Sequence, residues 1–147
     1  MPSFNTLWSN LPTQLEYPCD QSKYTNQCAI RMSVAFQKSN IDVSRCPAVK
    51  CDFSISTHKS PKHFLRAQEL ANWIKDTGLF GKTHTYSRSE LNKAGGKKKF
   101  KDRKGIIFIE DGWGPTDHID LWNGHLIKNG SDNYFEKGIR IWFWDIL

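Results

Sequence analysis

The stretch YTNQCAIRMSVAF, Tyr24–Phe36, places three polar residues directly before a cysteine and then continues as an apolar, helix-compatible segment. Its apolar residues recur at spacings that fall on one face of a helix: Ala29, Met32, Ala35 and Phe36. Cys28 would therefore lie in the first turn of a helix, where unpaired backbone N–H groups and the helix dipole favour the thiolate over the thiol. The stretch marks Cys28 as a candidate nucleophile, with a small buried packing residue as the alternative.

Two further helices are predicted after this segment. Ser60-Pro61 supplies a cap and a first-turn proline for a helix that ends before Gly78. A short third helix is predicted over Ser87 to Lys93, which opens with the capping-box pattern from Ser87 to Glu90. The first half of the chain is therefore expected to be mainly helical.

From Gly105 onward the chain changes character. β-Branched and aromatic runs are separated by Gly, Asn and Asp, in the segments GIIFIED, HIDLWNG, HLIKNG and GIRIWFWDIL. The linkers between these runs are too short for helical crossovers, so the sheet should be largely antiparallel. We expect a single α+β domain over residues 1–147, with N-terminal helices packed on a C-terminal antiparallel sheet.

The chain is basic, with a net charge of +6 over 147 residues, and should be drawn to polyanions. Much of this charge lies between Lys93 and Gly105, which we interpret as a solvated internal loop. Only Phe100 interrupts that run, whereas a single-strand binder interleaves several stacking aromatics with its basic residues. Nucleic acid is therefore not the expected partner, although a basic binding module without catalysis stays as the alternative function.

Two kinds of segment are missing from the sequence pattern. No apolar run approaches the roughly 18 residues of a membrane-spanning helix. The opening MPSFNTLWSNLPTQLEYP has neither a basic start nor a continuous apolar stretch, so no secretory signal is expected.

The cysteines raise the question of compartment. Cys46 and Cys51 flank PAVK in a proline-containing loop, so a local disulfide is feasible, whereas zinc would need two further ligands at comparable spacing. Disulfides indicate an oxidising compartment, which is at odds with the missing signal. A protein made in one cell and acting in the envelope of another would satisfy both observations.

A nucleophilic cysteine needs a base from elsewhere in the chain. We interpret three histidines as surface residues and a fourth as a turn residue: His58, His63 and His84, and His125. His118 differs because it begins a predicted strand directly after the turn-rich DGWGPTD, where its side chain can face a cleft. A cysteine that opens a helix, followed by a histidine that opens a strand, is the chain order of papain-like hydrolases.

A third group must hold the imidazole. Asp120 shares a strand face with His118. A hairpin that turns at Asn123-Gly124 would bring Asn129 or Asp132 back beside His118, and the sequence leaves this choice open. Asp117, His118 and Asp120 lack the usual ligand set of zinc or calcium sites, so we expect neither a metal nor another cofactor.

Four segments, NQCAIRMSVAF, HFLRAQELANWI, KGIIFIEDGWG and DHIDLWNG, in this order and spacing resemble the fourth family of type VI secretion amidase effectors. The resemblance implies a papain-like, NlpC-type cysteine hydrolase that cuts peptidoglycan stem peptides between D-glutamate and meso-diaminopimelate. It also implies injection by the type VI apparatus without a signal peptide, action in the periplasm of the target cell, and a cognate immunity protein as a partner.

Carried over by position, the resemblance implies that Cys28 is the nucleophile and His118 the general base. The family's third residue, an aspartate, corresponds most nearly to Asn129, and Asp132 is the slightly favoured alternative because a carboxylate stabilises imidazolium better than an amide does. The backbone N–H of Cys28, with Gln21 or Asn26, would stabilise the oxyanion.

Overall fold

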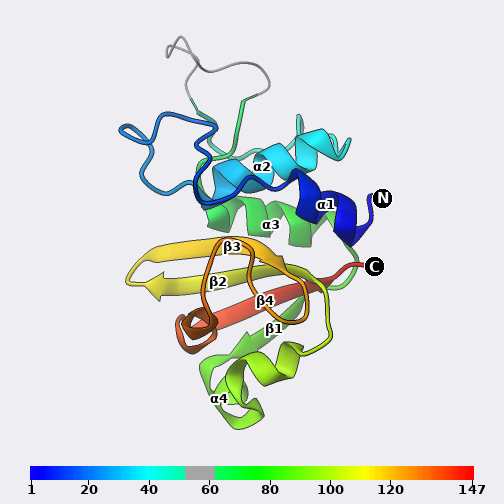
Figure 1. Ribbon diagram of the computed structural model, residues 1–147, viewed down its shortest axis with the longest axis vertical. Coiled ribbons are helices and arrows are strands. Elements are labelled where there is room, and N and C mark those ends of the chain that lie inside the picture. Colours follow the sequence, from blue (N-terminus) through cyan, green and yellow to red (C-terminus); the bar gives the residue numbers. More distant parts are fainter. Residues whose placement is uncertain (52–61) are drawn as a thin grey trace.

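The structure is a computed structural model that describes residues 1–51 and 62–147 (Figure 1). The helices are α1 (Phe4–Asn10), α2 (Cys28–Lys38), α3 (Ala67–Thr77) and α4 (Arg88–Ala94), with 3-10 turns η1 (Gly96–Phe100) and η2 (Asp132–Glu136). The strands are β1 (His84–Ser87), β2 (Gly105–Trp113), β3 (Thr116–Trp122) and β4 (Arg140–Asp145). No helix among the described residues is long and apolar enough to cross a membrane.

The four strands form one antiparallel sheet in the order β1-β4-β2-β3. The expected α+β class and the antiparallel sheet are therefore confirmed. Two details of the strand prediction were wrong. The polar run that forms β1 was not predicted as a strand, yet it pairs with β4 at the edge of the sheet. The segment HLIKNG, which was predicted as a strand, makes only an isolated bridge between Trp122 and Ile127.

The sheet is covered on both faces. Helices α1, α2 and α3 lie along one face, whereas α4 lies on the other (Figure 1). Successive residues of β2 point to opposite sides, as the pleat requires. Ile106 and Phe108 pack with the helices α1–α3, and Ile107 and Ile109 pack on the other face with Phe100. Because the sheet is buried on both sides, β2 reads as a continuous apolar run rather than an alternating one.

Two of the three predicted helix starts are confirmed. Helix α2 begins at Cys28, and α4 is capped by Ser87 in a complete capping box with Glu90. Helix α3 instead begins at Ala67. The predicted start at residues 60–61 lies outside the described residues, and Phe64 is engaged in an antiparallel bridge to Lys50. This bridge keeps the chain extended up to the helix.

The basic segment between Lys93 and Gly105 follows α4 as the 3-10 turn η1 and a short connection to β2. Its single aromatic residue, Phe100, is fully buried against Phe135 and Phe143. The lysines next to Phe100 remain exposed. The segment is therefore an internal connection anchored by its aromatic side chain.

Candidate active site

Cys28 is the first residue of α2, and its helix is anchored by Ala29 and Met32, which are fully buried. Immediately before the helix, Asn26 folds back so that its Oδ1 accepts a hydrogen bond from the Cys28 N–H at 3.3 Å. The Cys28 thiol lies 3.9 Å from the carbonyl oxygen of Asp117, at the start of the strand that carries His118. Helix α2 and strand β3 thus bring the two predicted residues together.

His118 lies on β3 opposite Ile109 of β2, directly after Asp117, whose carbonyl oxygen the Cys28 thiol contacts. Its Nε2 lies 2.8 Å from Oδ2 of Asp120, and its side chain is 13% exposed. With Nε2 engaged by the carboxylate, Nδ1 is the ring nitrogen left for the thiol. The three side chains form a Cys–His–Asp series.

Asp120 is the group that holds the imidazole. Its side chain is 1% exposed and each of its oxygens accepts hydrogen bonds. Oδ2 accepts from His118 and from the backbone N–H of Asn129 at 3.0 Å, while Oδ1 accepts from the backbone N–H of Leu121 at 2.8 Å. A buried carboxylate needs such partners, and here they also fix its orientation toward the ring.

Of the three candidates for the third residue, the structure places Asp120 against the imidazole and gives the side chains of Asn129 and Asp132 other partners. The chain does turn back after β3, but it brings only the backbone N–H of Asn129 to the carboxylate. The Asn129 side chain instead donates to the carbonyl of Pro12 at 2.8 Å. The prediction assumed that the returning segment would present a side chain to the imidazole, whereas in the structure it presents a backbone N–H to Asp120.

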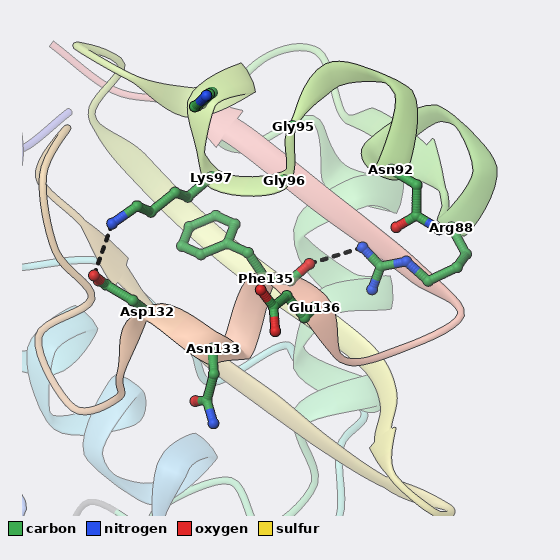
Figure 2. A pocket seen from close by; sticks show the side chains of 10 residues that line it. Arg88, Asn92, Gly95, Gly96, Lys97, Asp132, Asn133, Phe135 and Glu136 are labelled. Atoms are coloured by element: carbon green, nitrogen blue, oxygen red, sulfur yellow. Dashed lines mark hydrogen bonds and ion pairs between the residues drawn. The ribbon is translucent and has the colours of Figure 1, made fainter.

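Asp132 lies at a different place. Its Oδ2 pairs with the Lys97 ammonium at 2.7 Å, at the rim of a pocket of about 750 Å³ between α4, η1 and η2 (Figure 2). Phe135 and Glu136 of η2 also line the pocket, and the Arg88 guanidinium donates a hydrogen bond to the Phe135 carbonyl. Asp132 thus joins η2 to η1 and does not orient the imidazole.

The protonation of His118 reflects this environment. Burial by itself favours the neutral ring, but the hydrogen bonds to Asp120 and Cys28 outweigh it and raise the pKa of His118 to about 10. The imidazolium is therefore the stable form near neutral pH.

Two aromatic side chains that the sequence did not assign to the site enclose the imidazole. Tyr134 of η2 meets the His118 ring edge-on at a centroid distance of 5.1 Å, and Trp113 of β2 meets it at 5.8 Å. Trp113 and Tyr134 also contact each other at 4.8 Å. These contacts restrict the imidazole to one orientation. In the sequence, the aromatic residue in EDGWG is the only signal that indicates an aromatic side chain beside His118.

The oxyanion residues predicted from sequence are placed unequally. Asn26 lies at the site, with its Nδ2 3.5 Å from the Asp117 carbonyl and its Oδ1 on the Cys28 N–H. Gln21 lies exposed in the preceding turn, and no described contact joins it to Cys28 or His118. The structure therefore places Asn26 beside the helix start, and no described contact brings Gln21 to it.

The predicted Cys46–Cys51 disulfide is not confirmed, because the structure contains no disulfide between the described cysteines. Cys46 packs into the core beneath α1–α3, while Cys51 packs with Cys19 and Ile30 in a separate cluster. His63, interpreted from sequence as a surface residue, is buried beside Cys19 and Cys51. His58 lies outside the described residues.

Comparison with known families agrees with this geometry. The model of the family described as "Type VI secretion system (T6SS), amidase effector protein 4", Tae4, matches residues 24–144. The match includes Cys28, His118 and Asp120. No curated protein sequence matches the chain.

Solved structures of Tae4 proteins share the fold over the whole chain. Tae4 of Salmonella Typhimurium, solved in complex with the immunity protein Tai4, is 21% identical with a TM-score of 0.73, covering 100% of this chain and 99% of that one. Tae4 of Enterobacter cloacae is 20% identical with a TM-score of 0.71, covering 100% and 98%. A Salmonella typhimurium Tae4 bound to Tai4 from Enterobacter cloacae is 22% identical with a TM-score of 0.71, covering 100% and 99%.

Proposed function

Because the chain belongs to the type VI secretion amidase effector family 4, we propose that it is a cysteine amidase that cuts peptidoglycan stem peptides. The proposed bond is the amide between D-glutamate and meso-diaminopimelate. The observation that carries the mechanism is the series Cys28–His118–Asp120, with the thiol at a helix start and the imidazole held by a buried carboxylate. These are the parts that nucleophilic catalysis by cysteine requires.

In the first half of the reaction, the Cys28 thiolate attacks the amide carbonyl carbon and a C–S bond forms. Negative charge then develops on the carbonyl oxygen, and we expect the N-terminus of α2 and the Asn26 amide beside it to stabilise this charge. The His118 imidazolium gives its proton to the amine of meso-diaminopimelate as the C–N bond breaks. The amine leaves, and the D-glutamate carbonyl remains attached to Cys28 as a thioester.

In the second half, the now neutral His118 takes a proton from water. The hydroxide attacks the thioester carbonyl, the C–S bond breaks, and the acid is released with the Cys28–His118 pair restored. Asp120 keeps the imidazole in one orientation through both halves and stabilises its charged form. Trp113 and Tyr134 exclude water from the sides of the ring.

The setting of this reaction follows from the family. Delivery by the type VI apparatus would bring the enzyme to the periplasm of a rival bacterium, where peptidoglycan is exposed. Its basic charge would hold it near the anionic wall. A Tai4-like immunity protein is the proposed protective partner in the producing cell, because the related effectors of Salmonella and Enterobacter were solved with Tai4.

Digestion of purified sacculi tests the reaction and the bond together. The released fragments should carry a new free amino group on meso-diaminopimelate and a free carboxyl on D-glutamate, as resolved by liquid chromatography and mass spectrometry. His118→Gln, checked for folding by circular dichroism, is the matched inactive control. An unchanged fragment pattern would refute the amidase, and new ends at another position would refute the proposed bond.

A further inference from the structure

A second group of cysteine and histidine side chains lies outside the proposed catalytic series. Cys19, Cys51 and His63 are all buried, and their Sγ, Sγ and Nδ1 or Nε2 atoms lie within 4.8 Å of one another. His63 Nδ1 lies 3.1 Å from the Cys19 sulfur and 3.9 Å from the Cys51 sulfur. One ring nitrogen therefore faces both thiols.

The backbone around these residues is arranged as a small frame. Cys51 and His63 face each other across a short antiparallel pairing, in which the Cys51 N–H donates to the His63 carbonyl at 2.9 Å. The His63 N–H donates in turn to the Cys51 sulfur at 3.1 Å. Peptide N–H groups that donate to a ligating sulfur orient it and reduce its charge, as supporting hydrogen bonds do in metal sites.

We propose that Cys19, Cys51 and His63 bind a zinc ion. Tetrahedral zinc with Zn–S near 2.3 Å and Zn–N near 2.1 Å places its sulfur and nitrogen ligands about 3.6 Å apart. The two observed sulfur–nitrogen distances, 3.1 and 3.9 Å, lie on either side of this spacing. Two thiolates and an imidazole select zinc over magnesium or calcium. A water molecule or another donor completes the coordination.

No sequence pattern indicates this site, because its ligands come from separate segments of the chain. The spacing of Cys46 and Cys51 argues against zinc there, since no further ligand stands near them in the chain. The structure combines Cys51 with Cys19 and His63, which come from two other segments. Cys46 takes no part, since it packs in the core beneath α1–α3.

The site lies next to the segment that leads into α2. The side-chain amide of Gln27 donates to the Cys19 carbonyl at 3.2 Å and to the Tyr24 carbonyl at 2.7 Å, and Ile30 packs against Cys19 and Cys51. A metal on Cys19 would therefore hold the turn before Cys28 against the Cys51–His63 pairing. This consequence for activity rests on the proposed function, whereas metal binding itself does not.

A disulfide between Cys19 and Cys51 is the competing use of the two thiols. It would use the two sulfurs alone, although the His63 ring nitrogen lies against both of them. The arrangement of one nitrogen with two sulfurs is that of a ligand set. The zinc site and the disulfide predict different metal contents and different numbers of reduced thiols.

The experiment uses the full chain, purified under reducing conditions and loaded with Zn²⁺ or Co²⁺ alone. We expect one metal ion per chain after gel filtration, measured by elemental mass spectrometry, and a thiolate-to-cobalt charge-transfer band in the near ultraviolet. Cys19→Ser, Cys51→Ser and His63→Gln should each weaken binding by tenfold or more, since each removes one of three ligands. Cys46→Ser is the matched control and should bind as the wild type does.

Two results would overturn the site. One is reduced wild-type protein that takes up no zinc or cobalt; the other is a cobalt spectrum unchanged in Cys19→Ser. A Cys19–Cys51 disulfide that forms equally fast with and without zinc would also refute it. Cys28→Ala should still bind the metal, so failure of the zinc site and failure of the proposed amidase are separately visible.

Discussion

The His118 imidazole is backed by a buried carboxylate, whereas the His63 imidazole lies against two thiols. Both rings are largely enclosed, and each is in contact with a cysteine of the same N-terminal region. In the first group the carboxylate holds a positive charge on the ring and aligns one ring nitrogen with Cys28. In the second group the ring nitrogen of His63 faces the sulfurs of Cys19 and Cys51.

This difference shows that a cysteine–histidine contact does not by itself define a nucleophile. The position of the cysteine and the third partner of the imidazole decide which chemistry the pair supports. Cys28 begins a helix and faces an imidazole that can accept and return a proton, as catalysis requires. Cys19 lies in the irregular segment before that helix, in a set of soft donors that fits a metal ion. The same two residue types thus support different chemistry in one small protein.

The largest expected effect on activity separates Cys28 from Cys46. Cys28→Ala should lower kcat/KM for stem-peptide hydrolysis by at least ~10⁴-fold, because it removes the nucleophile. The matched control Cys46→Ala should retain wild-type turnover, since Cys46 only packs in the core. The rate of sacculus hydrolysis, monitored by the release of new amino groups, measures the activity of both variants.

Brief alkylation with iodoacetamide provides the independent test of the same contrast. Peptide mapping should find the modification on Cys28 before any other cysteine. Initial labelling at Cys19, together with full activity in Cys28→Ala, would reverse the roles assigned to the two groups.

The second prediction concerns the third partner. Asp120→Asn should lower turnover by about 10²- to 10³-fold, because the imidazole loses the carboxylate that orients it and stabilises its charge. The loss should be smaller than in a serine triad, since a thiolate and an imidazolium partly hold each other. Thermal unfolding must accompany the kinetics, because Asp120 also accepts two backbone hydrogen bonds. Wild-type turnover in a folded Asp120→Asn protein would refute the orienting role.

The sequence predicted what local patterns control. The start of α2 at Cys28 and the capping box of α4 follow from a few neighbouring residues. The apolar runs of β2 and β4 follow from burial on both sides of the sheet. Cys28 and His118 could be singled out because each opens a regular element, and these positions favour reactive side chains.

What the sequence missed depends on contacts between distant segments. Phe64 is kept out of α3 by its bridge to Lys50, and His63 is buried by two cysteines from other parts of the chain. The identity of the third residue depended on how the chain returns after β3. Asp120 shares a strand face with His118, as the sequence indicated, and reaches the ring directly. No periodicity reveals that the returning segment offers a backbone N–H rather than a side chain.

The third prediction uses pH to compare the wild type with Asp120→Asn. The pKa of His118 is raised to about 10, so the alkaline limb of kcat/KM should lie near pH 10, where the imidazolium loses its proton. Without the carboxylate the pKa of the ring should fall, and the limb should move to lower pH. Activity profiles and NMR titration of the imidazole measure this shift. Identical alkaline limbs in the two proteins would contradict it.

The same raised pKa predicts a pH-dependent contribution to folding. Because the folded value lies above the ordinary value of 6.5, the stabilisation from protonated His118 is fully present below about pH 6.5. It is lost as the pH rises through about 10. The difference in Tm between wild type and His118→Gln should therefore narrow from pH 6.5 to pH 10, and a widening difference would reverse the sign of the coupling.

The smallest expected effect is at Asp132, which the sequence analysis slightly favoured as the orienting residue because a carboxylate stabilises imidazolium better than an amide does. Its partner in the structure is Lys97, and the two side chains are 64% and 48% exposed. An exposed ion pair contributes at most about 1 kcal/mol, because water screens both charges. Asp132→Ala should therefore change the free energy of unfolding by less than about 1 kcal/mol and leave turnover unchanged. Lys97→Ala removes the same pair from the other side and is the matched control. If Asp132→Ala reduced turnover as strongly as Asp120→Asn while Lys97→Ala did not, the carboxylate beside His118 would have to be exchanged during catalysis, and η2 would have to move toward the ring.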